Sequence, residues 1–92
     1  MENIISEEKL KKYFDVTSRA YSKAEKSGNK TKIDRVDILD MVSRYVSDAK
    51  HFYLKKDFVN AFAALNYAHG WLDCGARLGI FDVHDSELFT AD

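Results

Sequence analysis

A cluster of polar side chains that could do chemistry lies in the least polar part of the chain. His69, Asp73 and Arg77 follow one another at four-residue spacing, which places them along one line of a helix. A carboxylate among apolar residues needs a partner, and both neighbours on this line are within reach of Asp73. Two interpretations stay open: a structural ion-pair cluster, or the polar lining of a small-ligand pocket.

Cys74 is the only cysteine, which excludes an internal disulfide and a multi-cysteine metal site. No histidine stands at a helical spacing that would activate this thiol, so we expect it to be buried and inert. A single free cysteine is typical of a reducing compartment. The N-terminus is acidic and lacks the basic and apolar regions of an export signal, so we expect a cytoplasmic protein.

Carboxylates and a histidine also recur between residues 37 and 51. Asp48 and His51 are three residues apart and share a helix face with Asp37 and Asp40, a spacing that can converge on an ion. Arg44 stands among them, and its cation would repel a metal. The pattern therefore predicts exposed ion pairs, and we expect neither a metal nor a cofactor.

Arginine is followed by histidine after six residues at Arg44–His51 and at Arg77–His84. This pattern resembles the Arg-x-His motif of helical ribonucleases of the higher-eukaryote-and-prokaryote nucleotide-binding class. The first match falls on an exposed helix face and the second crosses a predicted helix end. We therefore favour a protein that is not an enzyme.

The two halves of the chain differ in charge. Residues 1–35 carry nine basic and six acidic residues, net +3, and residues 36–92 carry five and nine, net −4. The basic residues form a stripe on the first predicted helix, away from its apolar side. Such a stripe can bind RNA or nucleotides, or it is a solvated face attracted to an acidic patch of another subunit. The stripe consists of Lys9, Lys12, Arg19, Lys23 and Lys26.

The chain has no proline and only four glycines, so long helices are the simplest interpretation. Ser6, Asp34 and Asp57 are candidate N-caps, and Gly28 is a candidate C-cap. The link between the second and third helices, around Lys55-Lys56-Asp57, is very short, which predicts an antiparallel pair. The predicted helices span residues 6–27, 34–56 and 58–81. We predict one all-α domain over residues 1–92, an up-down-up three-helix bundle with an N-terminal tail (1–5) and an acidic C-terminal tail (82–92).

The third predicted helix is apolar on nearly every side. Its charged residues argue against a membrane span, so we place it at the centre of the bundle with Leu65 and Leu72 in the core. Small residues would let another helix approach closely. These small residues are Ala61, Ala64, Ala68 and Gly75.

Apolar residues on this helix exceed what two neighbouring helices can cover, notably Tyr67, Trp71 and Leu78. Either Leu88 and Phe89 of the C-terminal tail cover them, or a second copy does so in a two-fold symmetric dimer. We expect a non-enzymatic module that binds a protein partner or itself. RNA or nucleotide binding is the alternative.

Residues 45–83 carry a more specific pattern. Its most distinctive part runs Tyr67-Ala68-His69-Gly70-Trp71-Leu72-Asp73, with Asp48-Ala49 and Asp57 before it and Gly75 after it. This string resembles the core of an archaeal family catalogued as domain of unknown function 357. The resemblance implies a compact three-helix bundle in an archaeal cytoplasm. It supplies no catalytic residues to carry over and leaves the function open.

Overall fold

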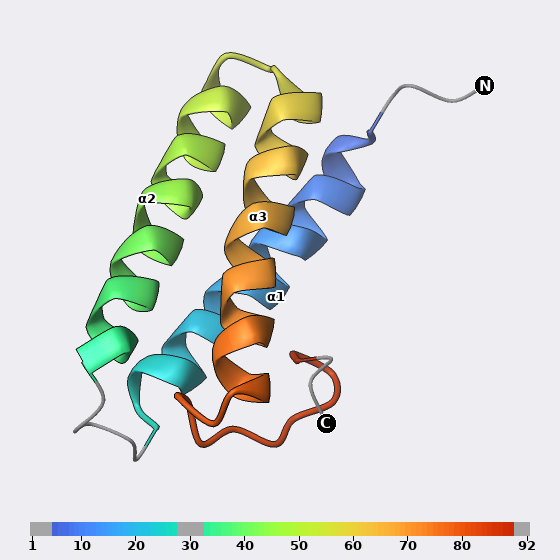
Figure 1. The fold of residues 1–92 in the computed structure, drawn as a ribbon. Coiled ribbons are helices and arrows are strands. Elements are labelled where there is room, and N and C mark those ends of the chain that lie inside the picture. The colour runs from blue at the N-terminus through green and yellow to red at the C-terminus, as the bar shows by residue number, and fades with distance from the viewer. Residues whose placement is uncertain (1–4, 28–32, 90–92) are drawn as a thin grey trace.

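The computed structural model describes residues 5–27 and 33–89, which form three helices and a C-terminal tail (Figure 1). The helices are α1 (Glu7–Glu25), α2 (Ile33–Leu54) and α3 (Phe58–Arg77). Successive helices run in alternating directions, and the described residues contain no strand. The predicted all-α three-helix bundle is confirmed.

Side chains cap the beginnings of α1 and α3. The Ser6 hydroxyl oxygen accepts a hydrogen bond from the backbone N–H of Lys9 at 3.1 Å. The Asp57 carboxylate accepts from the backbone N–H of Asn60 at 3.3 Å and from its side-chain amide at 2.7 Å. The bonds from the backbone N–H groups of Lys9 and Asn60 satisfy donors that the first turn of a helix leaves without a partner. These two predicted caps are confirmed.

Some predicted helix limits are wrong. α1 ends at Glu25 with Lys26 as its C-cap, and Gly28 lies outside the described residues. α2 begins at Ile33, so Asp34 is not its N-cap, and α2 ends at Leu54, before the predicted limit of residue 56. It stops there because Lys56 adopts a positive φ of 61°, a left-handed conformation that interrupts a right-handed helix.

α3 ends at Arg77 and not at residue 81 as predicted. Gly79 has a φ of 72°, which reverses the chain. The N–H of Ile80 then bonds back to the carbonyl of Gly75 at 2.8 Å, as in a glycine-terminated helix end. The residues that follow form the tail instead of another helical turn.

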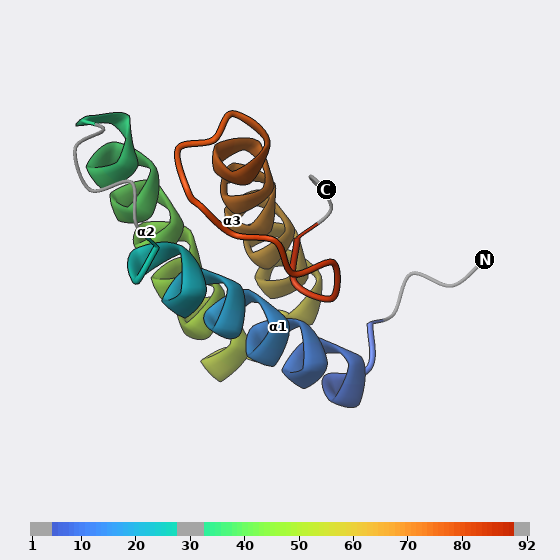
Figure 2. The ribbon, with the colours of Figure 1, turned by 90° about the horizontal axis from the view of Figure 1, so that it is seen from below.

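α3 packs against both other helices, whereas α1 and α2 contact each other least (Figure 2). Leu65 and Leu72 are fully buried, as predicted. They belong to two clusters of apolar side chains, one at each end of the bundle: Leu65 packs with Leu10 and Ala49, and Leu72 packs with Val42. Among the described residues, no helix combines the length and apolarity needed to cross a membrane.

The C-terminal tail folds back onto the bundle beside α1 and α3 (Figure 2). Leu88 and Phe89 are each 2% exposed, and they pack into the same cluster as Ala20, Ala68 and Leu72. The sequence left open whether the tail or a second copy covers the surplus apolar residues of α3. The tail of the same chain covers one side of the helix. The opposite side of α3 is not covered.

Candidate interaction surface

The uncovered side of α3 is built mainly from uncharged residues. Tyr67 is 61% exposed, Leu78 64% and Val59 54%. Three small exposed residues stand between these large ones, at spacings of three or four that keep them on one side of the helix. We call this surface the α3 outer face. It consists of Val59, Ala63, Tyr67, Gly70, Cys74 and Leu78.

Tyr67 is positioned by α2. Its ring stacks on that of Tyr45, with the centroids 4.9 Å apart and the planes inclined by 28°. Beside it lies a shallow hollow of about 250 Å³, which is lined by Tyr67, Gly70, Trp71 and Cys74. Trp71 is half-buried and packs against the core, so it contributes one edge of this hollow. Of the three residues predicted for self-association, Tyr67 and Leu78 are exposed and Trp71 is partly covered.

Cys74 is exposed on the α3 outer face, so the expectation that its thiol is buried is wrong. Leu72 and Gly75, its near neighbours in sequence, point into the core instead. A helix that is apolar on every side does not reveal which of its sides is buried.

His69 and Asp73 lie on a different side of α3, next to the tail. The Nε2 atom of His69 is 3.7 Å from the Oδ1 atom of Asp73, and the side chains are 20% and 22% exposed. The His69 ring lies near that of Phe89, with 6.4 Å between centroids. Arg77 is exposed at the helix end. The structure thus joins His69 to Asp73 as the spacing predicted, and the hollow on α3 lies on another side of the helix.

The basic stripe of α1 is exposed along its whole length, but parts of it already have partners. Arg19 pairs with Asp15 at 3.5 Å. The ammonium of Lys9 lies 5.5 Å from the ring centre of Phe62, within the range of a cation–π contact. These contacts reduce the share of the stripe that is free for an external anion.

The acidic tail meets the end of this stripe. Lys23 donates a hydrogen bond to Asp85 Oδ2 at 2.5 Å. This bond, together with one from the backbone N–H of Glu87, lowers the pKa of Asp85 below its ordinary value. An acidic patch was predicted to attract the stripe from another subunit, whereas here the chain supplies Asp85 itself.

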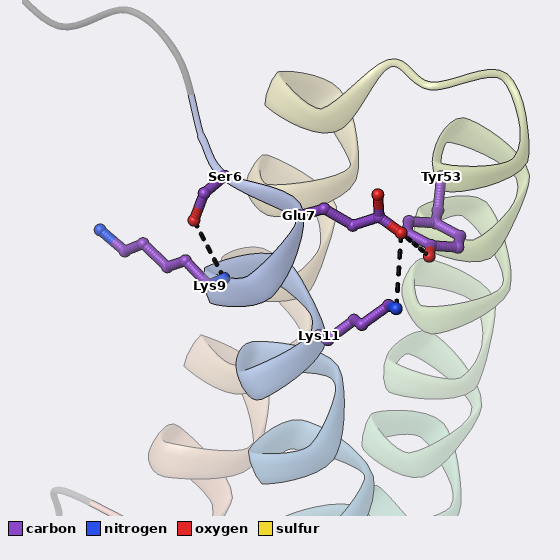
Figure 3. A network of polar contacts seen from close by, with 5 residues as sticks. All are labelled: Ser6, Glu7, Lys9, Lys11 and Tyr53. Carbon is purple, nitrogen blue, oxygen red and sulfur yellow. Dashed lines mark hydrogen bonds and ion pairs between the residues drawn. The ribbon is translucent and has the colours of Figure 1, made fainter.

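A second polar contact joins α1 to α2 (Figure 3). The hydroxyl of Tyr53 donates to Glu7 Oε2 at 2.6 Å, and the ammonium of Lys11 lies 3.5 Å from the same oxygen. The bond from Tyr53 is the main reason that the pKa of Glu7 is lowered, and the same bond raises the pKa of Tyr53. Glu7 and Tyr53 are 46 residues apart in the sequence, and no spacing pattern gave a sign of this bond.

One predicted ion pair of α2 is present, between Asp40 and Arg44 at four-residue spacing. Asp40 and Arg44 lie 3.0 Å apart, and both side chains are exposed. His51 is also exposed, and His84 contacts Asp82 at 3.1 Å. Across residues 5–27 and 33–89, no three side chains of the kinds that bind metals gather into a site.

A groove of about 310 Å³ that sequence reasoning missed lies between α1 and α2. Its hydroxyl groups come from two helices whose register cannot be read from spacing alone. Partial burial in this region is the main reason that the pKa of Tyr21 is raised. The groove is lined by Ser18, Tyr21, Ser43, Val46, Ser47 and Lys50.

A family model matches residues 12–81, which is more than half of the chain. The chain belongs to the family described as protein of unknown function (DUF357). The DUF357 match contains the whole α3 outer face and ends at Phe81, before the part of the tail that holds Asp85 and Leu88. No curated protein and no solved structure matched the chain.

Proposed function

We propose that this DUF357 protein is a non-enzymatic interaction module that binds a protein partner through the α3 outer face. The observation that carries the proposal is the exposure of Tyr67 and Leu78 on one continuous side of α3. Single exposed apolar residues are normal on protein surfaces. Here three large ones share one side of the helix from Val59 to Leu78 with small ones between them, over about 28 Å of helix.

The packing of the tail and of α2 on α3 leaves the same face of this helix exposed. The tail covers the side of α3 that holds His69, and α2 covers the side that holds Trp71. The face between them carries no carboxylate, and aromatic residues are enriched at protein interfaces. A reducing cytoplasm is part of the proposal because the one cysteine lies on this face, and an archaeal setting rests on the family resemblance.

Capture from an extract of the source organism tests the proposal. The immobilised wild-type protein should retain an identified partner. A Val36→Ser/Leu54→Ser control should retain the same partner, because its two changed residues are exposed on another part of the surface (65% and 80%). A Tyr67→Ser/Leu78→Ser variant with unchanged circular dichroism should lose it. Equal capture by all three proteins would contradict the proposal.

RNA or nucleotide binding by the basic stripe of α1 is the alternative proposal. Exposed Lys12 and Lys26 support it, whereas the ion pairs of Arg19 and Lys23 count against it. Binding to mixed-sequence RNA at about 50 mM salt, weakening steeply as salt rises, would favour it. A Lys12→Glu/Lys26→Glu variant should then lose binding. The matched control, Lys55→Glu/Lys56→Glu, has the same net charge and should retain it.

A further inference from the structure

We propose that the groove between α1 and α2 binds a small hydroxylated anion of the sugar-phosphate class. The groove shares no lining residue with the α3 outer face or with the basic stripe of α1, so the proposal goes beyond both functions considered above. Two features of the described residues carry it. Both walls of the groove present hydroxyl groups that lack hydrogen bonds, and one end presents an ammonium group that lacks an ion pair.

The groove is open because small side chains separate its two helices. α1 and α2 both pack on α3 but contact each other least. Large apolar side chains normally fill the space between neighbouring helices. Here Ser18 of α1 faces Ser43 and Ser47 of α2, and a space of about 310 Å³ remains. This volume is at the lower end of the range for small-molecule sites, so it suits one small molecule and not a polymer.

The hydroxyl groups lie along one side of each helix. Ser43, Ser47 and Lys50 are four and three residues apart, which keeps them on one side of α2 over about 10 Å. Ser18 and Tyr21 are three residues apart on α1. All three serines are exposed, and across residues 5–27 and 33–89 their hydroxyl groups have no hydrogen-bond partner. A hydroxyl group both donates and accepts, so these serines match the hydroxyl groups of a ligand.

The floor of the groove is apolar. Tyr21 and Val46 are half-buried and pack against the core. A sugar ring presents C–H groups on its faces and hydroxyl groups at its edges. Its faces match this floor and its edges match the serines, in the usual combination of an apolar site with a few polar groups that fix orientation.

Lys50 supplies the positive charge at one end of the groove. Its side chain also lines an adjoining hollow of about 290 Å³ beside Phe14, so it stands where the two hollows meet. Lys11 lines that second hollow, but it already pairs with Glu7 at 3.5 Å. Among the described residues, Lys50 has no such carboxylate. Its ammonium is a point charge of the kind that binds phosphate groups.

The other end of the groove sets the orientation of the ligand. Glu25 and Asp40 lie close enough to Tyr21 to add to the effect of burial, which raises the pKa of this tyrosine. Carboxylates at this end repel an anion. The phosphate therefore binds at Lys50, and the hydroxylated body extends toward Tyr21.

NMR titration of the full chain tests the site. The probe is ribose 5-phosphate at constant ionic strength, and ribose and inorganic phosphate are the two partial probes. Because the groove is open, we expect a Kd of about 1 mM for ribose 5-phosphate. Each partial probe should bind about tenfold more weakly, since it uses only one of the two features. The largest backbone amide shifts should fall at Ser18, Ser43 and Ser47.

Two pairs of variants separate the charge from the hydroxyl groups. Lys50→Met should weaken binding about tenfold. Lys55→Met removes an exposed ammonium outside the groove and should bind like the wild type. Ser43→Ala/Ser47→Ala should also weaken binding about tenfold. Ser22→Ala removes a hydroxyl group of α1 that does not line the groove and should have no effect. Unchanged circular dichroism checks that every variant folds.

Three outcomes would overturn the proposal. The first is the absence of amide shifts with about 10 mM ribose 5-phosphate. The second is equal binding by Lys50→Met and Lys55→Met, or inorganic phosphate that binds as tightly as ribose 5-phosphate. The third is a set of shifts centred on Lys12 and Lys26, which would place the binding on the basic stripe of α1 and not in the groove.

Discussion

The ring of Phe81 fills the space that a side chain on Gly75 would need. A Cβ atom at residue 75 would lie 2.4 Å from Phe81 Cε2 and 2.6 Å from Phe81 Cδ2, and Phe81 is only 1% exposed. A small residue was predicted here to let another helix approach, but it is the first turn of the tail that approaches. This contact fixes the point from which the tail folds back over the bundle.

Gly75→Ala should therefore destabilise the protein. Alanine favours a helix over glycine by about 1 kcal/mol, but forcing a methyl group against a buried ring costs about 1–3 kcal/mol. We expect a net loss of up to about 2 kcal/mol in the free energy of unfolding, measured by chemical denaturation of dilute protein. Faster hydrogen exchange at Leu88 and Phe89 should accompany it.

Gly70→Ala is the matched control, since it makes the same change in the same helix with open space around it. It should be neutral or stabilise the monomer by up to about 1 kcal/mol. Equal effects at both positions would show that the Phe81 ring does not control the cost.

Leu65→Ala and Leu72→Ala should each lower the free energy of unfolding by about 2–5 kcal/mol. Both side chains are fully buried, one in each cluster of the core, so each change leaves a cavity. Leu54→Ala, at a position 80% exposed, should change stability little. Thermal or chemical melts of the three variants check this, and unchanged melts for both core variants would place α3 outside the core.

Sequence reasoning succeeded where the chemistry is local. Ser6 and Asp57 are identifiable as N-caps because a cap bonds to a backbone N–H only three residues away. It failed at the end of α3, because Leu78, Ile80 and Phe81 are as apolar as the helix before them. The positive φ of Gly79, and not a change in hydrophobicity, ends this helix.

The candidate surface was predictable only in part. The sequence indicated surplus apolar residues on α3, but a helix that is apolar all round does not reveal which side the tail takes. The error at Cys74 has this cause. Contacts between distant segments were missed for another reason: Lys23 and Asp85 are 62 residues apart and Glu7 and Tyr53 are 46 apart, so no spacing rule connects them.

Tyr53→Phe should raise the pKa of Glu7 toward its ordinary value, because the hydroxyl that bonds to the carboxylate is removed. In the wild type, the lowered pKa of Glu7 means that this contact contributes to stability above the unfolded-state pKa. The contribution is lost as pH falls through the folded-state pKa. The pKa of Tyr53 is raised, so the same contact contributes to stability below the unfolded-state pKa of this tyrosine. That contribution is lost as pH rises through the folded-state pKa of Tyr53.

Carboxyl NMR titration of Glu7 measures this effect. Tyr13→Phe removes a hydroxyl elsewhere on the bundle and should leave the Glu7 titration unchanged. Lys11→Met removes a weaker contributor and should raise the pKa less than Tyr53→Phe does. An unchanged Glu7 titration in Tyr53→Phe would contradict the hydrogen bond.

The tail should loosen when Lys23 or the charge of Asp85 is lost. The pKa of Asp85 is lowered mainly by the bond from Lys23, so this contact contributes above the unfolded-state pKa and is lost as pH falls through the folded-state pKa. Lys23→Met should speed hydrogen exchange at Leu88 and Phe89 at neutral pH, and high salt should narrow the difference in exchange rate from wild type.

Lys26→Met is the matched control, since Lys26 lines the same hollow between α1 and the tail and its loss leaves the Lys23–Asp85 bond in place. Because Leu88 and Phe89 are also held by apolar burial, Lys23→Met should loosen the tail without releasing it, and equal exchange in the two variants would show that burial alone holds it.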